Sequence, residues 1–73
     1  LHHARLEIAR MVCERLRQAT ERATFGEARV TVSIGVGLFD PTTMGQDTEA
    51  FVRSIDRALY RAKANGRNRV EVS

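Results

Sequence analysis

The stretch that decides the fold is "RVTVSIGVGLF", residues 29–39. Every second residue in it is apolar, which is the pattern of a β-strand with one buried face. The apolar positions are Val30, Val32, Ile34, Val36 and Leu38. The other face is small and polar, and its two glycines, Gly35 and Gly37, would allow another backbone or a ligand to approach closely. The sequence therefore predicts a strand over 29–39 whose apolar face lies against helices.

A helix is predicted on the N-terminal side of this strand. The segment "ARLEIARMVCERLRQAT", residues 4–20, repeats its apolar residues at steps of three and four, as an amphipathic helix does. The predicted core positions are Ala4, Ile8, Met11, Val12, Leu16 and Ala19. Cys13 is the single cysteine, and we interpret it as packed in the core rather than as a reactive thiol.

A second helix and a short strand follow the loop "DPTTMGQ". The helix is predicted over 47–65, with Asp47 as its N-cap and Gly66 as the left-handed residue just beyond its C-terminal end. Its core stripe comprises Phe51, Ile55, Ala58, Leu59 and Ala62. The final strand is predicted over 68–72. The order helix, strand, helix, strand indicates an α/β fold of the α+β sandwich type, and because two strands rarely form a stable sheet alone, we expect part of a larger domain.

Composition and charge exclude several classes of protein. With 42% hydrophobic and 29% charged residues, the 73-residue chain is typical of a globular segment, and it contains no membrane segment. The net charge of +3 is too small to indicate nucleic acid, and three Phe and one Tyr are too few for base stacking. One cysteine allows no internal disulfide, which fits a cytoplasmic location.

Few residues are suited to catalysis. The chain has no Ser/His/Asp set, no paired cysteines and no phosphate-binding glycine loop. His2 and His3 lie at the N-terminus without a third metal ligand, so we predict no metal site. Asp56 lies within the second helix, where we expect it to form a structural hydrogen bond or ion pair rather than to act as an acid or base.

Lys63 and Arg67 leave two interpretations open. Basic side chains in the last turn of a helix stabilise its negative end, and on spacing alone this interpretation is favoured. Lys63 also lies about 40° beyond Leu59, at the border of the apolar stripe. Arg67 follows just after the Gly66 stop. Two cations held at such a bend could clamp a polyphosphate, the arginine through its planar fork and the lysine as a point charge.

Two blocks of the sequence resemble a known family. "VTVSIGVGLF" and "SIDRALYRAKANGRNRV" closely resemble the C-terminal half of GGDEF domains, the diguanylate cyclases, whose pattern is a "TvSiG" strand followed by "AD-x-ALY-x-AK-xx-GRN-x-v". The helix over 4–20 is similar to the one that follows the signature hairpin of that family. The structural motif residues shared with the family are Ser33, Gly35, Asp56, Tyr60, Gly66 and Asn68. Ile55 departs from the pattern, since the family usually has alanine there.

The resemblance implies a fold and an activity. Members of the family have a nucleotidyl-cyclase-like domain and condense two GTP molecules, one on each subunit of a dimer, into the bacterial second messenger cyclic di-GMP. They use two Mg²⁺ or Mn²⁺ ions. On this resemblance, Lys63 and Arg67 would contact the GTP phosphates, and Arg15 would fall at the product-inhibition site.

The GG(D/E)EF hairpin and the family's metal-binding carboxylates do not occur in the 73 residues, because they precede residue 1 in the family order. We therefore expect a fragment of a diguanylate cyclase that has no catalytic residue of its own and is inactive alone, although its parent is a nucleotidyltransferase. The alternative is a non-catalytic, degenerate GGDEF-like effector or dimerisation module that binds nucleotide or a protein partner. In either case the apolar faces predict a homodimer or a domain-swapped oligomer.

Overall fold

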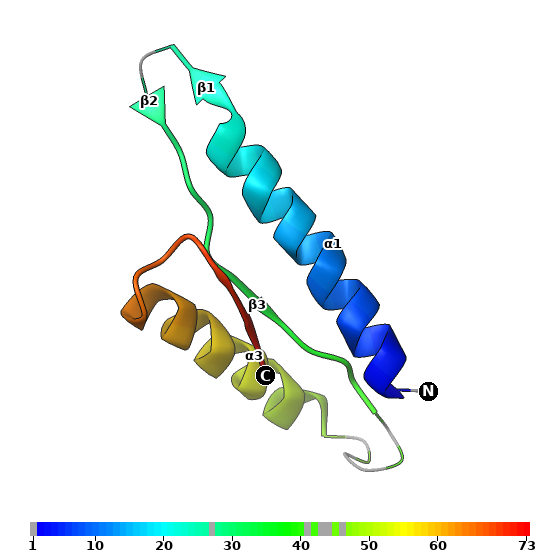
Figure 1. Ribbon diagram of the computed structural model, residues 1–73. Coiled ribbons are helices and arrows are strands. Elements are labelled where there is room, and N and C mark those ends of the chain that lie inside the picture. Colours follow the sequence, from blue (N-terminus) through cyan, green and yellow to red (C-terminus); the bar gives the residue numbers. More distant parts are fainter. Residues whose placement is uncertain (1, 27, 41, 43–44, 46) are drawn as a thin grey trace.

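The computed structural model describes residues 2–26, 28–40, 42, 45 and 47–73. Figure 1 shows an elongated molecule, with principal extents of 47 × 23 × 17 Å. Its elements are α1 (His2–Arg22), β1 (Thr24–Phe25), β2 (Ala28–Arg29), β3 (Ile34–Val36), α3 (Thr48–Ala64) and β4 (Val70–Val72). The mixture of two helices and a small sheet confirms the predicted fold class. The loop predicted at 40–46 and the side chains of His2 and His3 lie largely outside the described residues.

The central feature is a parallel pair of strands between two helices. β3 and β4 pair in the register Ile34↔Val70, Gly35↔Glu71 and Val36↔Val72. Figure 1 shows this pair between α1 and α3, and each helix contacts both strands. A parallel pair requires a long crossover connection, which α3 provides. β1 and β2 form a separate antiparallel hairpin at the far end of α1.

The strands are shorter than the sequence predicted. The expected strand over 29–39 is divided: Ala28–Arg29 pairs within the hairpin, and β3 begins only at Ile34. Because ladder hydrogen bonds require a partner, β3 is as long as the three-residue β4 against which it lies. The strand expected over 68–72 begins at Val70, because Arg67 and Asn68 have φ angles of 61° and 49°, outside the extended region.

α3 begins and ends where its capping residues predicted. The Asp47 carboxylate accepts a hydrogen bond from the Ala50 backbone N–H (2.9 Å) at the first turn. At the other end, the Gly66 N–H donates to the Lys63 carbonyl (3.4 Å) and the Arg67 N–H donates to the Ala62 carbonyl (2.8 Å). This pair of bonds is the Schellman motif, and Gly66 occupies its left-handed position with a φ of 118°.

The Asp47 cap is directly testable. We expect Asp47→Ala to reduce the free energy of unfolding by about 1 kcal/mol, because one N–H at the start of α3 loses its acceptor. Asp56→Ala is the matched control: it makes the same chemical change at an exposed site within α3, where alanine is the better helix former. Urea unfolding followed by circular dichroism measures both variants, and equal destabilisation would contradict the capping role.

α3 lies unusually close to the sheet because small residues meet on both sides of the contact. Ala58 and Ala62 are fully buried. A β-carbon added to Gly35 would lie 2.7 Å from both the Ile55 carbonyl oxygen and the Leu59 backbone nitrogen. α3 therefore packs on the face of β3 that carries Gly35. The sequence predicted helices on the opposite face, which carries the alternating apolar residues. Because side chains alternate along a strand, the neighbours of Gly35 in β3 point to the opposite side of the sheet.

The buried face of α1 differs from the predicted one. The large predicted core residues are exposed: Ile8 by 60%, Met11 by 48%, Val12 by 61% and Leu16 by 58%. The half-buried positions that repeat along the other side of the helix are Leu6, Ala9, Cys13, Arg17 and Thr20. The prediction was wrong for this chain because periodicity identifies the most apolar face of a helix but not its partner. Here the narrow sheet contacts the lesser face, on which Cys13 does pack.

Candidate functional site

Two unpaired cations lie at the C-terminal end of α3. The side chains of Lys63 and Arg67 are exposed, and within the described part of the chain neither forms an ion pair or a side-chain hydrogen bond. By contrast, the neighbouring Arg61 donates through Nη2 to the Val72 carbonyl oxygen (2.7 Å). Lys63 and Arg67 are thus not engaged by another described side chain, and their binding of an anion stays a prediction.

The backbone at Arg67 is in an uncommon conformation. Gly66, Arg67 and Asn68 all have positive φ, and left-handed geometry costs an L-residue on the order of 1–2 kcal/mol. Asparagine tolerates it better than arginine does. Non-glycine residues of this kind occur most often where a site requires them. Arg67 also lies beyond the helix end, so the helix-dipole interpretation accounts for Lys63 but not for Arg67.

A polar cluster joins this turn to α1. Arg17 Nη1 donates to Asn68 Oδ1 (2.9 Å), and Asn68 Nδ2 donates to Glu21 Oε2 (2.5 Å). Arg17 Nε also binds the Glu14 carboxylate, at 3.0 Å from Oε2, and the Arg17 side chain is only 15% exposed. The hydrogen bond from Arg17 lowers the pKa of Glu14, and the same bond raises the pKa of Arg17, so both groups stay charged near neutral pH.

Sequence reasoning missed Arg17 and Glu21. Both lie outside the apolar stripe of α1, where charged residues are normally solvated. Asn68 was identified only as a motif residue. The one signal in the sequence was that an asparagine lies two residues after the Gly66 stop, since asparagine is a common left-handed residue. Its partners on α1 lie 47 and 51 residues earlier, so no local pattern could identify them.

Arg15 does not join the candidate site. Its side chain is exposed on α1. It precedes Arg17 by two positions, which on a helix places the two side chains about 200° apart. Because Arg17 points to Asn68, Arg15 points away from the turn that carries Arg67.

Of the remaining predicted residues, Ser33 and Gly35 have structural positions, whereas Tyr60 and Asp56 are exposed. Ser33 is half-buried just before β3, and Gly35 is the point of close approach to α3. Tyr60 is 72% exposed on α3. Asp56 is also exposed, and it forms no hydrogen bond or ion pair with any other residue that the structure describes. The structural bond expected for Asp56 is therefore not formed among the described residues.

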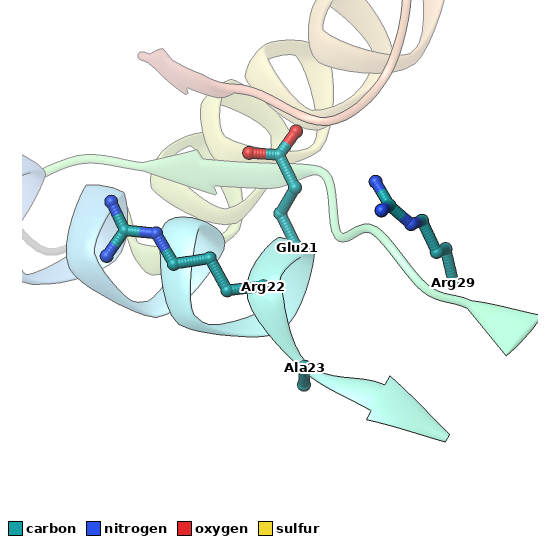
Figure 2. A pocket seen from close by; sticks show the side chains of 4 residues that line it. All are labelled: Glu21, Arg22, Ala23 and Arg29. Carbon is teal, nitrogen blue, oxygen red and sulfur yellow. The ribbon is translucent and has the colours of Figure 1, made fainter. Parts of the chain in front are cut away.

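A second basic region lies near the hairpin. A hollow of about 430 Å³ is lined by Glu21, Arg22, Ala23 and Arg29. Figure 2 shows that its two guanidinium groups do not converge, because the Arg22 side chain extends away from Arg29. The Glu21 carboxylate, which Figure 2 shows between the two arginine side chains, is already bonded to Asn68. This hollow is therefore not assembled to hold an anion.

The described residues contain neither a cluster of metal ligands nor a helix that could span a membrane. Within the described ranges, no three His, Cys, Asp or Glu side chains are grouped so as to hold a metal ion. The described residues therefore do not fit the Mg²⁺ or Mn²⁺ of the resemblance, and no metal-dependent step is assigned to them. None of the described helices is both long enough and apolar enough to span a membrane.

The family model and two relatives that match the chain all belong to one family of proteins. The family model described as "Diguanylate cyclase, GGDEF domain" matches residues 1–69. Diguanylate cyclase A of Treponema denticola is 34% identical over 77 residues, which cover 100% of this chain and 20% of that protein. Diguanylate cyclase DgcP of Pseudomonas aeruginosa is 42% identical over 72 residues, which cover 93% of this chain and 10% of that protein. The chain thus spans a fifth or less of these relatives, and no solved structure matches it.

Proposed function

Because the chain belongs to the GGDEF family of diguanylate cyclases, we propose that it is the phosphate-binding portion of such an enzyme. Lys63 and Arg67 contact the phosphates of a bound GTP. The enzyme that contains this portion condenses two GTP molecules into cyclic di-GMP, and it acts in the cytoplasm, where GTP is available. Arg15 contributes to a separate site for the cyclic di-GMP product.

The observation that carries this proposal is that Lys63 and Arg67, which have no side-chain partner among the described residues, lie at a helix end whose backbone is held by hydrogen bonds. The Schellman motif and the polar cluster hold the backbone on which Lys63 and Arg67 stand. A triphosphate carries several negative charges, and charge-assisted hydrogen bonds to it are about twice as strong as neutral ones. Arginine can bind two phosphate oxygens at once, whereas lysine supplies a compact charge.

The two cations have a defined chemical task. Phosphoryl-transfer enzymes act chiefly by positioning the phosphates and by stabilising the charge that develops on them. Lys63 and Arg67 neutralise charge on the GTP phosphates and orient them. The metal ions used by the family would supply further charge neutralisation, but no described residue is placed to hold them. We therefore propose that the 73-residue chain binds nucleotide and does not turn it over.

The experiment is a calorimetric titration of the chain with GTP and with inorganic triphosphate, together with incubation in GTP and Mg²⁺. Binding of both ligands without formation of cyclic di-GMP is the expected result. Failure of both to bind would refute the phosphate site. Cyclic di-GMP in the reaction mixture would refute the proposal that the chain is inactive.

The exposed apolar face of α1 favours self-association as a second property. Ile8, Met11, Val12 and Leu16 form a face of large hydrophobic residues without a partner among the described residues. A small chain buries little of its apolar surface, so covering such a face stabilises it. We propose that two copies associate through this face. Such an oligomer would also serve the alternative function, a non-catalytic effector or dimerisation module.

Substitution of Leu16 tests the association. We expect Leu16→Glu to shift the chain from a dimer or larger oligomer to a monomer in light scattering, because a carboxylate would be buried at the interface. Val52→Glu is the control, since Val52 is 54% exposed on α3, away from this face. A wild-type chain that runs as an 8.2 kDa monomer would contradict the proposal.

A further inference from the structure

Arg17 and Glu21 hold the side chain of Asn68 between them, and Asn68 directly follows the phosphate-binding candidate Arg67. We propose that Arg17 and Glu21 are positioning residues: through Asn68 they fix the left-handed turn and so hold Arg67 where it meets the phosphates of a nucleotide. This inference rests on the proposed function, and it adds to it a requirement for the contact between α1 and the turn.

In this contact, each of the three side chains of Arg17, Glu21 and Asn68 interacts with the other two. We name this group of residues the Asn68 clamp. Both polar atoms of the Asn68 amide are engaged, because Oδ1 accepts from Arg17 at 2.9 Å and Nδ2 donates to Glu21 at 2.5 Å. Arg17 Nη1 also lies 3.5 Å from Glu21 Oε1. The amide can therefore turn in neither direction without losing a charge-assisted bond.

Arg67 itself is held on both sides through its backbone. Its N–H donates to the Ala62 carbonyl oxygen at 2.8 Å, and its carbonyl oxygen accepts from Arg69 Nε at 3.2 Å. The Arg67 side chain, in contrast, has no partner within the described ranges. A fixed backbone with a free guanidinium is the arrangement expected of a residue that meets a ligand.

The clamp opposes the intrinsic preference of the turn. Arg67 and Asn68 have φ angles of 61° and 49°, and L-residues favour negative φ. If Asn68 returned to negative φ, the chain direction at Arg67 would change, and its guanidinium would have to be ordered again on binding. Holding a binding group in place beforehand reduces the entropy lost on binding. The clamp therefore acts on affinity through the conformation of the turn.

The first test compares two arginine substitutions on α1. We expect Arg17→Leu to weaken the binding of inorganic triphosphate by about fivefold, within the range of coupling measured between contacting residues. Arg10→Leu removes the same charge from the same helix. Arg10 borders the hollow that Arg17 and Asn68 also line, but its ion pair is with Glu7, and it forms no bond to the turn among the described residues. We expect it to weaken binding by less than about twofold. Equal losses in both variants would overturn the inference.

The second test separates positioning from a general loss of structure. In the Arg67→Ala background we expect Arg17→Leu to cause almost no further loss of triphosphate affinity, because the residue that it positions is already absent. A general weakening of the fold would reduce the remaining binding through Lys63 by the same factor in both backgrounds. That result would refute the positioning role.

Two substitutions of Asn68 separate the loss of its amide from the conformation of the turn. Both Asn68→Ala and Asn68→Gly remove the amide, but glycine adopts positive φ without a steric penalty. We expect Asn68→Gly to retain triphosphate binding better than Asn68→Ala. An equal loss would show that the conformation of the turn is not what the clamp controls.

A measurement without ligand keeps the inference separate from the proposed function. The three-bond HN–Hα couplings and the carbon chemical shifts of Arg67 and Asn68 report on φ in solution. We expect left-handed values in the wild-type chain and in Arg10→Leu, and averaged values in Arg17→Leu. Unchanged values in Arg17→Leu would overturn the clamp even if triphosphate bound tightly, whereas a clamp without triphosphate binding would refute the proposed function and the ligand part of this inference.

Discussion

Replacing Lys63 and Arg67 together by alanine should weaken the binding of inorganic triphosphate by about 100-fold or more. Each hydrogen bond to a charged group is worth about 1.5–3 kcal/mol, and every 1.4 kcal/mol changes affinity about tenfold. The loss should be large because both side chains lack partners within the described chain and have no competing internal bonds. Isothermal titration calorimetry at fixed ionic strength measures the effect.

A matched double substitution controls for net charge. Arg22→Ala with Arg57→Ala also removes two exposed basic side chains, so both double variants reduce the formal charge from +3 to +1. At about 0.15 M salt the screening length is about 8 Å, so distant charges contribute little. We expect the control to bind within about threefold of the wild type. Similar losses in the two double variants would show that only the overall charge attracts the anion.

Gly35→Ala should reduce the free energy of unfolding by about 3 kcal/mol, at the upper end of the cost of overpacking. The added methyl group would lie 2.7 Å from two backbone atoms of α3, the Ile55 oxygen and the Leu59 nitrogen. A backbone cannot rotate aside as a side chain can, so α3 as a whole would have to move from the sheet. For a domain of this size, the total stability is only about 4–11 kcal/mol.

Gly26→Ala isolates the steric part of this effect. A β-carbon at Gly26 would meet nothing within 4 Å, but the φ of 67° is unfavourable for alanine. We expect a loss of about 1 kcal/mol from the backbone conformation alone. Urea unfolding of the two variants should therefore differ by about 2 kcal/mol. Equal losses would show that α3 does not approach β3 as closely as the structure has it.

The predictable parts of the fold were those set by neighbouring residues. Asp47 and Gly66 mark the ends of α3 through bonds that span only a few residues, and both were identified from the sequence. The glycines of the predicted strand were likewise recognised as a place of close approach. The length of β3 was not predictable in this way, because it depends on its pairing with β4, which follows α3 in the sequence.

The parts that could not be predicted depend on distant contacts. The stronger apolar stripe of α1 was identified, but the face that contacts the sheet is the weaker one, and only the partner decides between them. The candidate site shows the same division. Lys63 and Arg67 were identified as phosphate contacts through the family resemblance, since their place at a helix end alone favoured the helix-dipole interpretation. Arg17 was not identified, because its contact with Asn68 spans 51 residues.

The contiguity of β3, α3 and β4 has a thermodynamic consequence. These elements lie within residues 34–72, whereas, among the described residues, α1 is attached to them through the bonds to Asn68, together with packing on one narrow face. Proteins open in units of different stability, and the contacts of α1 make it the unit of lower stability. Under the proposed positioning role, the docking of α1 and the binding of phosphate share one free energy of coupling. Such coupling is reciprocal. If docking of α1 raises the affinity for nucleotide by a given factor, a nucleotide bound at Arg67 must favour the docking of α1 by the same factor.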